Sequence, residues 1–149
     1  MINRLHLTNA LVNSMGQTLL RGEVLWAPVS PGELLDKISI LEIKEQRFFD
    51  AVKHAHVLHE LTVLREVSAE LTPSMELSAL TADLKSVNES LWGVEDDLRD
   101  CESRHDFGAQ FIALARAVYH HNDRRSAIKR QINELLGSRL VEEKVYVAY

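Results

Sequence analysis

The chain has 149 residues, which fits one ordinary domain whose core needs no disulfide or metal for stability. A hydrophobic fraction of 46% and a charged fraction of 26% are usual for a globular protein and exclude a disordered, collagen-like or membrane composition. The formal net charge of -5 argues against a duplex nucleic-acid partner, because nonspecific binding to a duplex depends on a cationic surface.

The single cysteine and the amino terminus bear on the compartment. Cys101 lies in an apolar helical pattern and has no second cysteine to pair with, so we interpret it as a small core residue in a reducing environment. The chain contains no apolar run of about 18 residues and lacks the pattern of a signal peptide. We therefore expect a cytoplasmic protein with no membrane partner.

The first strong helix signal begins at Ser30. Ser30 suits the N-cap, Pro31 the first helical position and Glu33 the reciprocal position of a capping box. The helix that follows carries apolar residues on two faces, which predicts a central helix or one shared with a partner chain. No Gly or Pro marks its end, and a break near 50–56 is our estimate. Residues 1–23 have weak periodicity and are interpreted as an N-terminal extension to a single helical domain over 24–149.

Two further long helices are predicted. Thr72 and Pro73 suit the start of one, whose apolar stripe runs from Leu77 to Cys101. Asp106 suits the cap of the other, which Gly137 should stop. The sequence thus predicts a mainly all-α fold, an antiparallel bundle of long helices with coiled-coil-like stripes. Alternating apolar residues also allow a short two-stranded ribbon formed by residues near 23–29 and 140–148.

Polar residues interrupt the apolar stripe of the last helix. His121, Asn122, Arg125 and Lys129 fall on the same face as Val118, Ile132 and Leu136. Cations in such a position need partners, because a buried unpaired charge costs several kcal/mol. We expect those partners on other helices, in a structural network that fixes helix register. Its predicted members are Glu42, Glu95, Glu102, Arg125 and Lys129.

Two functional alternatives use the same region. Asn122, Arg125, Lys129 and Arg99 are candidates for binding a phosphate or carboxylate group. Asp36, Glu42, Glu95 and Glu102 are candidates for holding a divalent cation, although their spacing matches an all-helical phosphohydrolase poorly. His54, His56 and His59 are interpreted as solvated histidines rather than metal ligands. The sequence has no Gly-rich phosphate loop, Cys pair or Ser elbow, and no catalytic residue is assigned.

Several motifs together resemble an uncharacterised family of small bacterial and phage proteins, a domain of unknown function. They are PVSPGELLDKISILEIK at 28–44, LWGVEDD at 91–97, NDRR at 122–125, INELLGS at 132–138 and EEK at 142–144. The resemblance covers about residues 26–149. The polar positions that match the family are Asp36, Glu42, Glu95, Asp96, Asn122, Asp123, Arg125 and Lys129. What the resemblance implies is contextual, an accessory role in bacterial surface-glycan biosynthesis.

The sequence favours a non-enzymatic helical binding or assembly module. A homo-oligomer is expected, with a dimer as the default, because the first long helix is apolar on two faces. A protein partner or a phosphate-containing small ligand is also expected. The alternative is a phosphate- or nucleotide-handling metal-dependent hydrolase with its polar site inside the bundle.

Overall fold

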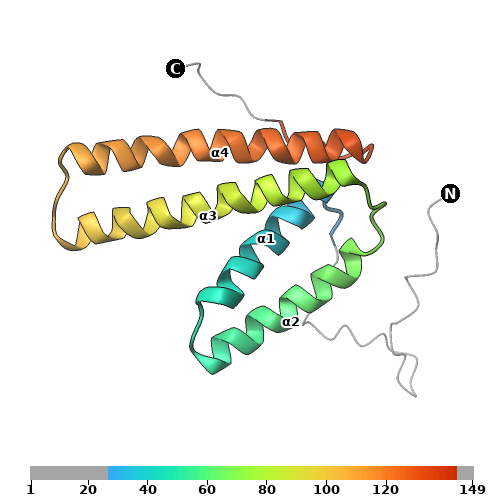
Figure 1. Ribbon diagram of the computed structural model, residues 1–149, viewed down its shortest axis with the longest axis horizontal. Helices are drawn as coiled ribbons and strands as arrows, with labels where there is room; N and C mark the ends of the chain where they lie inside the picture. Colours follow the sequence, from blue (N-terminus) through green and yellow to red (C-terminus); the bar gives the residue numbers. More distant parts are fainter. Residues whose placement is uncertain (1–26, 144–149) are drawn as a thin grey trace, which may run out of the picture.

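The computed structural model describes residues 27–143, which form four helices (Figure 1). They are α1 (Pro31–Arg47), α2 (Ala51–Ser68), α3 (Met75–Ser103) and α4 (Ala109–Leu135). The predicted all-α fold is confirmed. The described parts of the predicted ribbon, 27–29 and 140–143, form no strand, and the rest of it lies outside the described residues. The predicted extension over 1–23 also lies outside them.

The start of α1 follows the sequence prediction. The Ser30 hydroxyl accepts the backbone N–H of Glu33 at 3.3 Å, and Pro31 occupies the first turn. The Glu33 carboxylate bonds to Lys129 on α4, so this side chain joins two helices. The break after α1 falls at 48–50, at the near edge of the range predicted, and Asp50 caps α2 by accepting the Lys53 N–H at 2.9 Å.

Two predicted helix starts need correction. The long helix α3 begins at Met75, not at Thr72 and Pro73, because the Ser74 hydroxyl accepts the N–H of Leu77 at 3.0 Å and takes the N-cap position. The N-cap of α4 is Gly108 rather than Asp106. The Asp106 carboxylate accepts the Gly108 N–H at 3.1 Å, which closes a turn two residues before the helix.

The helices form two hairpins that cross. The long helices α3 and α4 lie antiparallel, and the shorter pair α1 and α2 packs under one half of them (Figure 1). Of the four helices, α1 alone packs against all three others, whereas α2 packs against α1 only. The prediction of a helix buried on two faces is therefore confirmed for α1, but its second face is covered by this chain's own α2 rather than by a partner.

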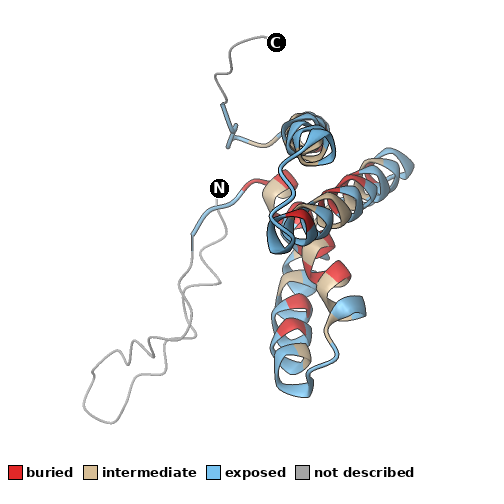
Figure 2. Ribbon diagram, turned by 90° about the vertical axis from the view of Figure 1, so that its left-hand side faces the viewer, coloured by how far each residue is buried: buried red, intermediate tan, exposed pale blue. Residues whose placement is uncertain are grey.

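The core lies where α1 meets the other helices. Figure 2 shows buried residues concentrated on α1 and on the sides of the helices turned toward it. Leu84 of α3 and Ile132 of α4 are fully buried in the core cluster that they form with the apolar residues of α1. Leu61 of α2, which is 1% exposed, belongs to the same cluster. The other half of the α3–α4 hairpin extends past α1 and α2, and Cys101 is buried inside it, as the sequence predicted.

Candidate functional site

The polar residues that interrupt the stripe of α4 face the first turns of α1. Asn133 accepts the backbone N–H of Gly32 at 2.8 Å, Lys129 bonds to Glu33, and Arg125 bonds to Asp36. The α4 residues are spaced by four, which places them on one face of that helix. A row of polar contacts thus fixes how far α1 is displaced along α4.

Asp36 is the centre of the most buried of these contacts. Its carboxylate is 3% exposed and accepts hydrogen bonds from two guanidinium nitrogens of Arg125, the Nε at 2.8 Å. Asn88 of α3 donates to the same carboxylate at 2.8 Å and to the Ser39 hydroxyl at 2.7 Å. The Ser39 hydroxyl donates to the Asp36 carbonyl at 2.8 Å. We call Asp36, Ser39, Asn88 and Arg125 the Asp36 cluster.

In the Asp36 cluster the charges of Asp36 and Arg125 are paired and the hydrogen-bonding groups are satisfied. The hydrogen bonds from Arg125 to the Asp36 carboxylate raise the pKa of the guanidinium further above its usual value, against the opposing effect of burial. Asn122 accepts a longer bond from the same guanidinium at 3.5 Å. Among the described residues, every buried side-chain nitrogen and oxygen has a hydrogen-bond partner. The cluster therefore joins α1, α3 and α4, and none of its buried polar atoms lacks a hydrogen-bond partner that a ligand could supply.

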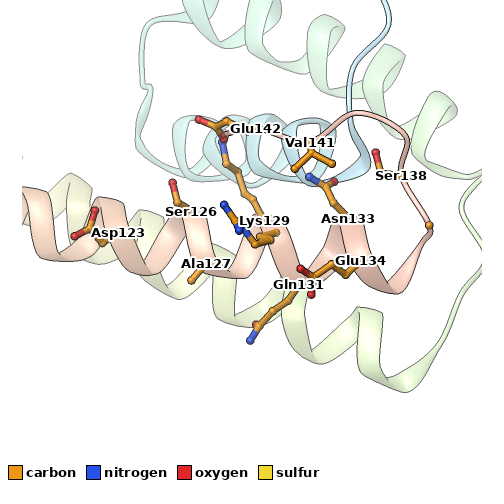
Figure 3. Close-up of a pocket in the computed structure, with 12 residues that line it drawn as sticks. Asp123, Ser126, Ala127, Lys129, Gln131, Asn133, Glu134, Ser138, Val141 and Glu142 are labelled. Atoms are coloured by element: carbon orange, nitrogen blue, oxygen red, sulfur yellow. The ribbon is translucent and has the colours of Figure 1, made fainter. Parts of the chain in front are cut away.

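Lys129 lies at the edge of a pocket of about 550 Å³ between α4 and the segment that follows it (Figure 3). Its side chain is 9% exposed and bonds to Glu33 and, at 2.9 Å, to Glu142. Burial lowers the pKa of Lys129, but the hydrogen bonds to the two glutamates raise it by more. Asp123, Glu134 and Glu142 also line the pocket against Lys129 and Arg130, so its formal charge is negative and does not favour an anion.

Glu42 of α1 joins α1 to α2 and to α3, whereas Asp36 joins α1 to α3 and α4. Glu42 accepts hydrogen bonds from Arg65 of α2 at 2.8 Å and Lys85 of α3 at 3.0 Å. Partial burial raises the pKa of Glu42, but the hydrogen bonds to Arg65 and Lys85 lower it by more, so the net shift is downward. The ionised form of Glu42 therefore stabilises the packing of α2 and α3 around α1.

Glu42→Gln is expected to lower the free energy of unfolding by on the order of 1 kcal/mol at pH 7. A carboxylate whose pKa is depressed in the folded protein stabilises above its ordinary value, here 4.5, and loses that contribution as the pH falls through the folded value. Urea denaturation at pH 7 and pH 3 should therefore show a difference between wild type and variant that shrinks at pH 3. A difference that is equal at the two pH values would contradict this role of Glu42.

The structure does not join the five residues of the predicted network. Arg125 and Lys129 lie in the interior as expected, but their partners come from α1 and the C-terminal segment. Glu95 bonds instead to Arg99 on its own helix at 3.0 Å, and Glu102 is exposed. The reason is the register of the α3–α4 hairpin, whose turn near residue 106 sets Arg125 beside Asn88. Glu95 lies about 10 Å further along α3, toward that turn.

The candidate ligand-binding residues are similarly separated. Asp36, Glu42 and Glu95 each bond to different basic side chains, and residues 27–143 contain no group of three or more His, Cys, Asp or Glu placed to hold a metal ion. Arg99 is paired with Glu95 and Asp96 on the surface, away from Arg125. His54, His56 and His59 lie along α2.

The sequence interpretation missed the residues that complete the row of contacts between α1 and α4, which are Gly32, Glu33 and Asn133. It also missed Ser39, which bonds to Asn88 of α3, and Glu142, which bonds to Lys129 from the segment after α4. One signal was present: Asn133 continues the four-residue spacing of Arg125 and Lys129, and Glu33 precedes Asp36 by one turn. Polar residues that recur at about one helical turn on each of two helices indicate that those helices pack along them.

The comparisons with other proteins add no assignment. None of the described helices combines the length and apolarity that crossing a membrane would need. The family resemblance stays a prediction. No family model, no curated protein and no solved structure matches this chain.

Proposed function

We propose that the chain is a non-enzymatic helical binding and assembly module that works in the cytoplasm as a homodimer. The observation that carries the proposal is the difference between the hydrogen-bonded polar side chains of the interior and the exposed apolar side chains of the surface. The buried side-chain nitrogens and oxygens of the described residues all have hydrogen-bond partners within the chain, whereas large apolar side chains lie exposed on the outside of the molecule. Paired interiors hold a fold together, and exposed apolar helix faces bind other helices.

The interior supports a structural role because its cations already have anions. Arg125 is bonded to Asp36, and Lys129 lies between Glu33 and Glu142. A phosphate or carboxylate ligand would have to displace these carboxylates, and the charge of the pocket beside Lys129 opposes its approach.

The exterior supports a binding role. Exposed large apolar residues lie close together in the chain along α2 and at the free half of the α3–α4 hairpin, where single scattered ones would be unremarkable in a globular protein. They include Val52, Leu58, Val63, Val67, Phe107, Ile112 and Tyr119. The accessory role in bacterial surface-glycan biosynthesis that the resemblance implies is the setting we propose for such a module.

The second candidate is a phosphate- or nucleotide-handling, metal-dependent hydrolase. One observation favours it, because the pocket beside Lys129 has a volume within the usual range of about 300 to 1,000 Å³ for small-molecule sites. The candidate metal ligands Asp36, Glu42, Glu95 and Glu102 would have to leave their present positions to bind one cation there.

Thermal-shift measurements discriminate the two functions. The panel would contain ATP, UDP-glucose, inorganic phosphate, Mg²⁺ and Mn²⁺ with the full chain. A ligand present at 100 times its dissociation constant stabilises the folded state by about 2.7 kcal/mol, which is several degrees of melting temperature. The assembly proposal expects no such shift, together with a concentration-dependent mass by light scattering. A shift that Lys129→Met abolishes would overturn it in favour of the hydrolase.

A further inference from the structure

The outward face of α2 carries a second stripe with coiled-coil spacing. The inward face is taken by Val57 and Leu61, which are buried against α1. On the opposite side Val52, His56, His59 and Val63 follow one another at intervals of four, three and four residues. This is the alternation of the a and d positions in a heptad repeat, by which one helix packs along another. We call these four residues the α2 seam.

The α2 seam is open in the described part of the chain. Val52 is 64% exposed and Val63 is 41% exposed, and none of the other three helices packs on that side of α2. A solvent-facing helix surface ordinarily carries charged residues at such positions. Two valines and two histidines at the positions of a helix interface therefore indicate that another helix covers them.

The α2 seam is complementary to itself when two copies run antiparallel. Aligning His56 of one copy with His59 of the other brings Val52 opposite Val63 at both ends of the contact. The same alignment brings Lys53 of each copy beside Glu60 of the other, at flanking positions where opposite charges favour pairing. Oε1 of Glu60 bonds to Lys37 of its own chain at 2.6 Å, so Lys53 of the second copy would use the other carboxylate oxygen. A two-fold axis repeats each of these contacts, as an isologous interface requires.

We propose that α2 is the self-association surface and that its occupant is the α2 of a second copy in antiparallel orientation. This inference rests on the proposed function as an assembly module and names the surface that it uses. An 18-residue helix is about 27 Å long, so a contact between two of them is small. Small interfaces of this kind correspond to weak dimers, and we expect a dissociation constant on the order of micromolar.

Cross-linking tests the orientation. In the full chain, Val52→Cys/Val63→Cys should form an intermolecular disulfide under mild oxidation, because each cysteine faces the other position of the second copy. Within one copy the two positions lie about 16 Å apart along the helix, too far for a disulfide. The native Cys101 is fully buried and gives the background. Each single variant should cross-link far less; rapid dimers from Val52→Cys alone would indicate a parallel pair and overturn the antiparallel alignment.

Matched charge substitutions test the surface. Val63→Glu should raise the dissociation constant of the dimer by about a hundredfold, because it buries two unpaired carboxylates. Met75→Glu makes the same change at the first residue of α3, which is 92% exposed and lies outside the surfaces proposed for binding, and it should leave the dimer unaffected. Circular dichroism of both variants confirms that each is folded.

The outcomes separate this inference from the proposed function. A dimer that Ile112→Glu on the free half of the α3–α4 hairpin abolishes and Val63→Glu leaves intact would overturn the α2 surface while the assembly function stands. A wild-type chain that is monomeric throughout would overturn both. A monomeric wild type that Val63→Glu unfolds would overturn the inference as well, because the α2 seam would then be buried within one chain.

Discussion

Asp36→Ala is expected to lower the free energy of unfolding by about 3 to 5 kcal/mol, because it leaves a guanidinium in the interior without its anion. Asp36 is 3% exposed and holds both Arg125 and Asn88, which come from different helices. Removing the carboxylate therefore weakens the contact of α1 with α3 and with α4 together. Equilibrium urea denaturation followed by circular dichroism measures the loss.

Lys37→Ala is the matched control for this substitution. It removes the charged neighbour of Asp36, but its side chain is 58% exposed and its bond to Glu60 is on the surface. An exposed ion pair contributes about 0 to 1 kcal/mol. A loss below about 1 kcal/mol for Asp36→Ala, equal to that of the control, would mean that the Asp36 cluster does not hold the helices together.

Gly32→Ala is expected to destabilise the protein by about 1 to 3 kcal/mol, because a β-carbon does not fit between α1 and α4. A β-carbon at Gly32 would lie 2.6 Å from the Lys129 carbonyl oxygen and 3.0 Å from Oδ1 of Asn133. Both neighbours belong to α4, and one is backbone, so the helices themselves must move apart. The hydrogen bond from the Gly32 N–H to Asn133 would lengthen with them.

Gly93→Ala should have the opposite sign. A β-carbon at Gly93, inside α3, meets no atom within 4 Å, and alanine favours the helix by about 0.5 to 1 kcal/mol. Thermal denaturation of both variants gives the comparison. A neutral Gly32→Ala would contradict the close approach of α1 and α4 at this point.

The fold class and several helix ends were predictable because they depend on short stretches of sequence. Ser30 and Pro31 start α1 as expected, and Gly137, at a φ of 62°, ends the last helix. The starts of α3 and α4 were misplaced where two capping residues compete within a few positions. Ser74 and Thr72 have similar N-cap propensities, and in the structure it is Ser74 that caps α3.

The candidate site was half predictable, for a different reason. Polar residues on an apolar stripe indicated that Lys129 is buried and Arg125 half-buried, since this depends only on helical periodicity. Their partners depend on how three helices are displaced along one another, and periodicity does not contain that information. The length of the α3–α4 turn brings Asn88, rather than Glu95, beside Arg125, and Asp36 reaches both from α1.

The surface to which we assign a partner chain is not the one on α1 that the sequence indicated. The sequence placed the partner chain on α1, whose two apolar faces are both covered within this chain. The exposed apolar residues of α2 and of the free half of the α3–α4 hairpin now support it. A pattern that is apolar on two sides indicates a central helix, and the chain itself supplied the cover.

We propose that the polar interior is structural and that the outer helix faces bind a partner. The most direct test replaces the buried polar group as a unit with Asp36→Leu, Asn88→Leu and Arg125→Met in one chain, since exchanging a whole buried ion pair for apolar residues is often neutral or stabilising. Sedimentation equilibrium then compares the mass of this variant with that of the wild type, each against the chain mass of 16.9 kDa. The account predicts a folded variant whose self-association equals that of the wild type. A folded variant that has lost self-association would contradict it.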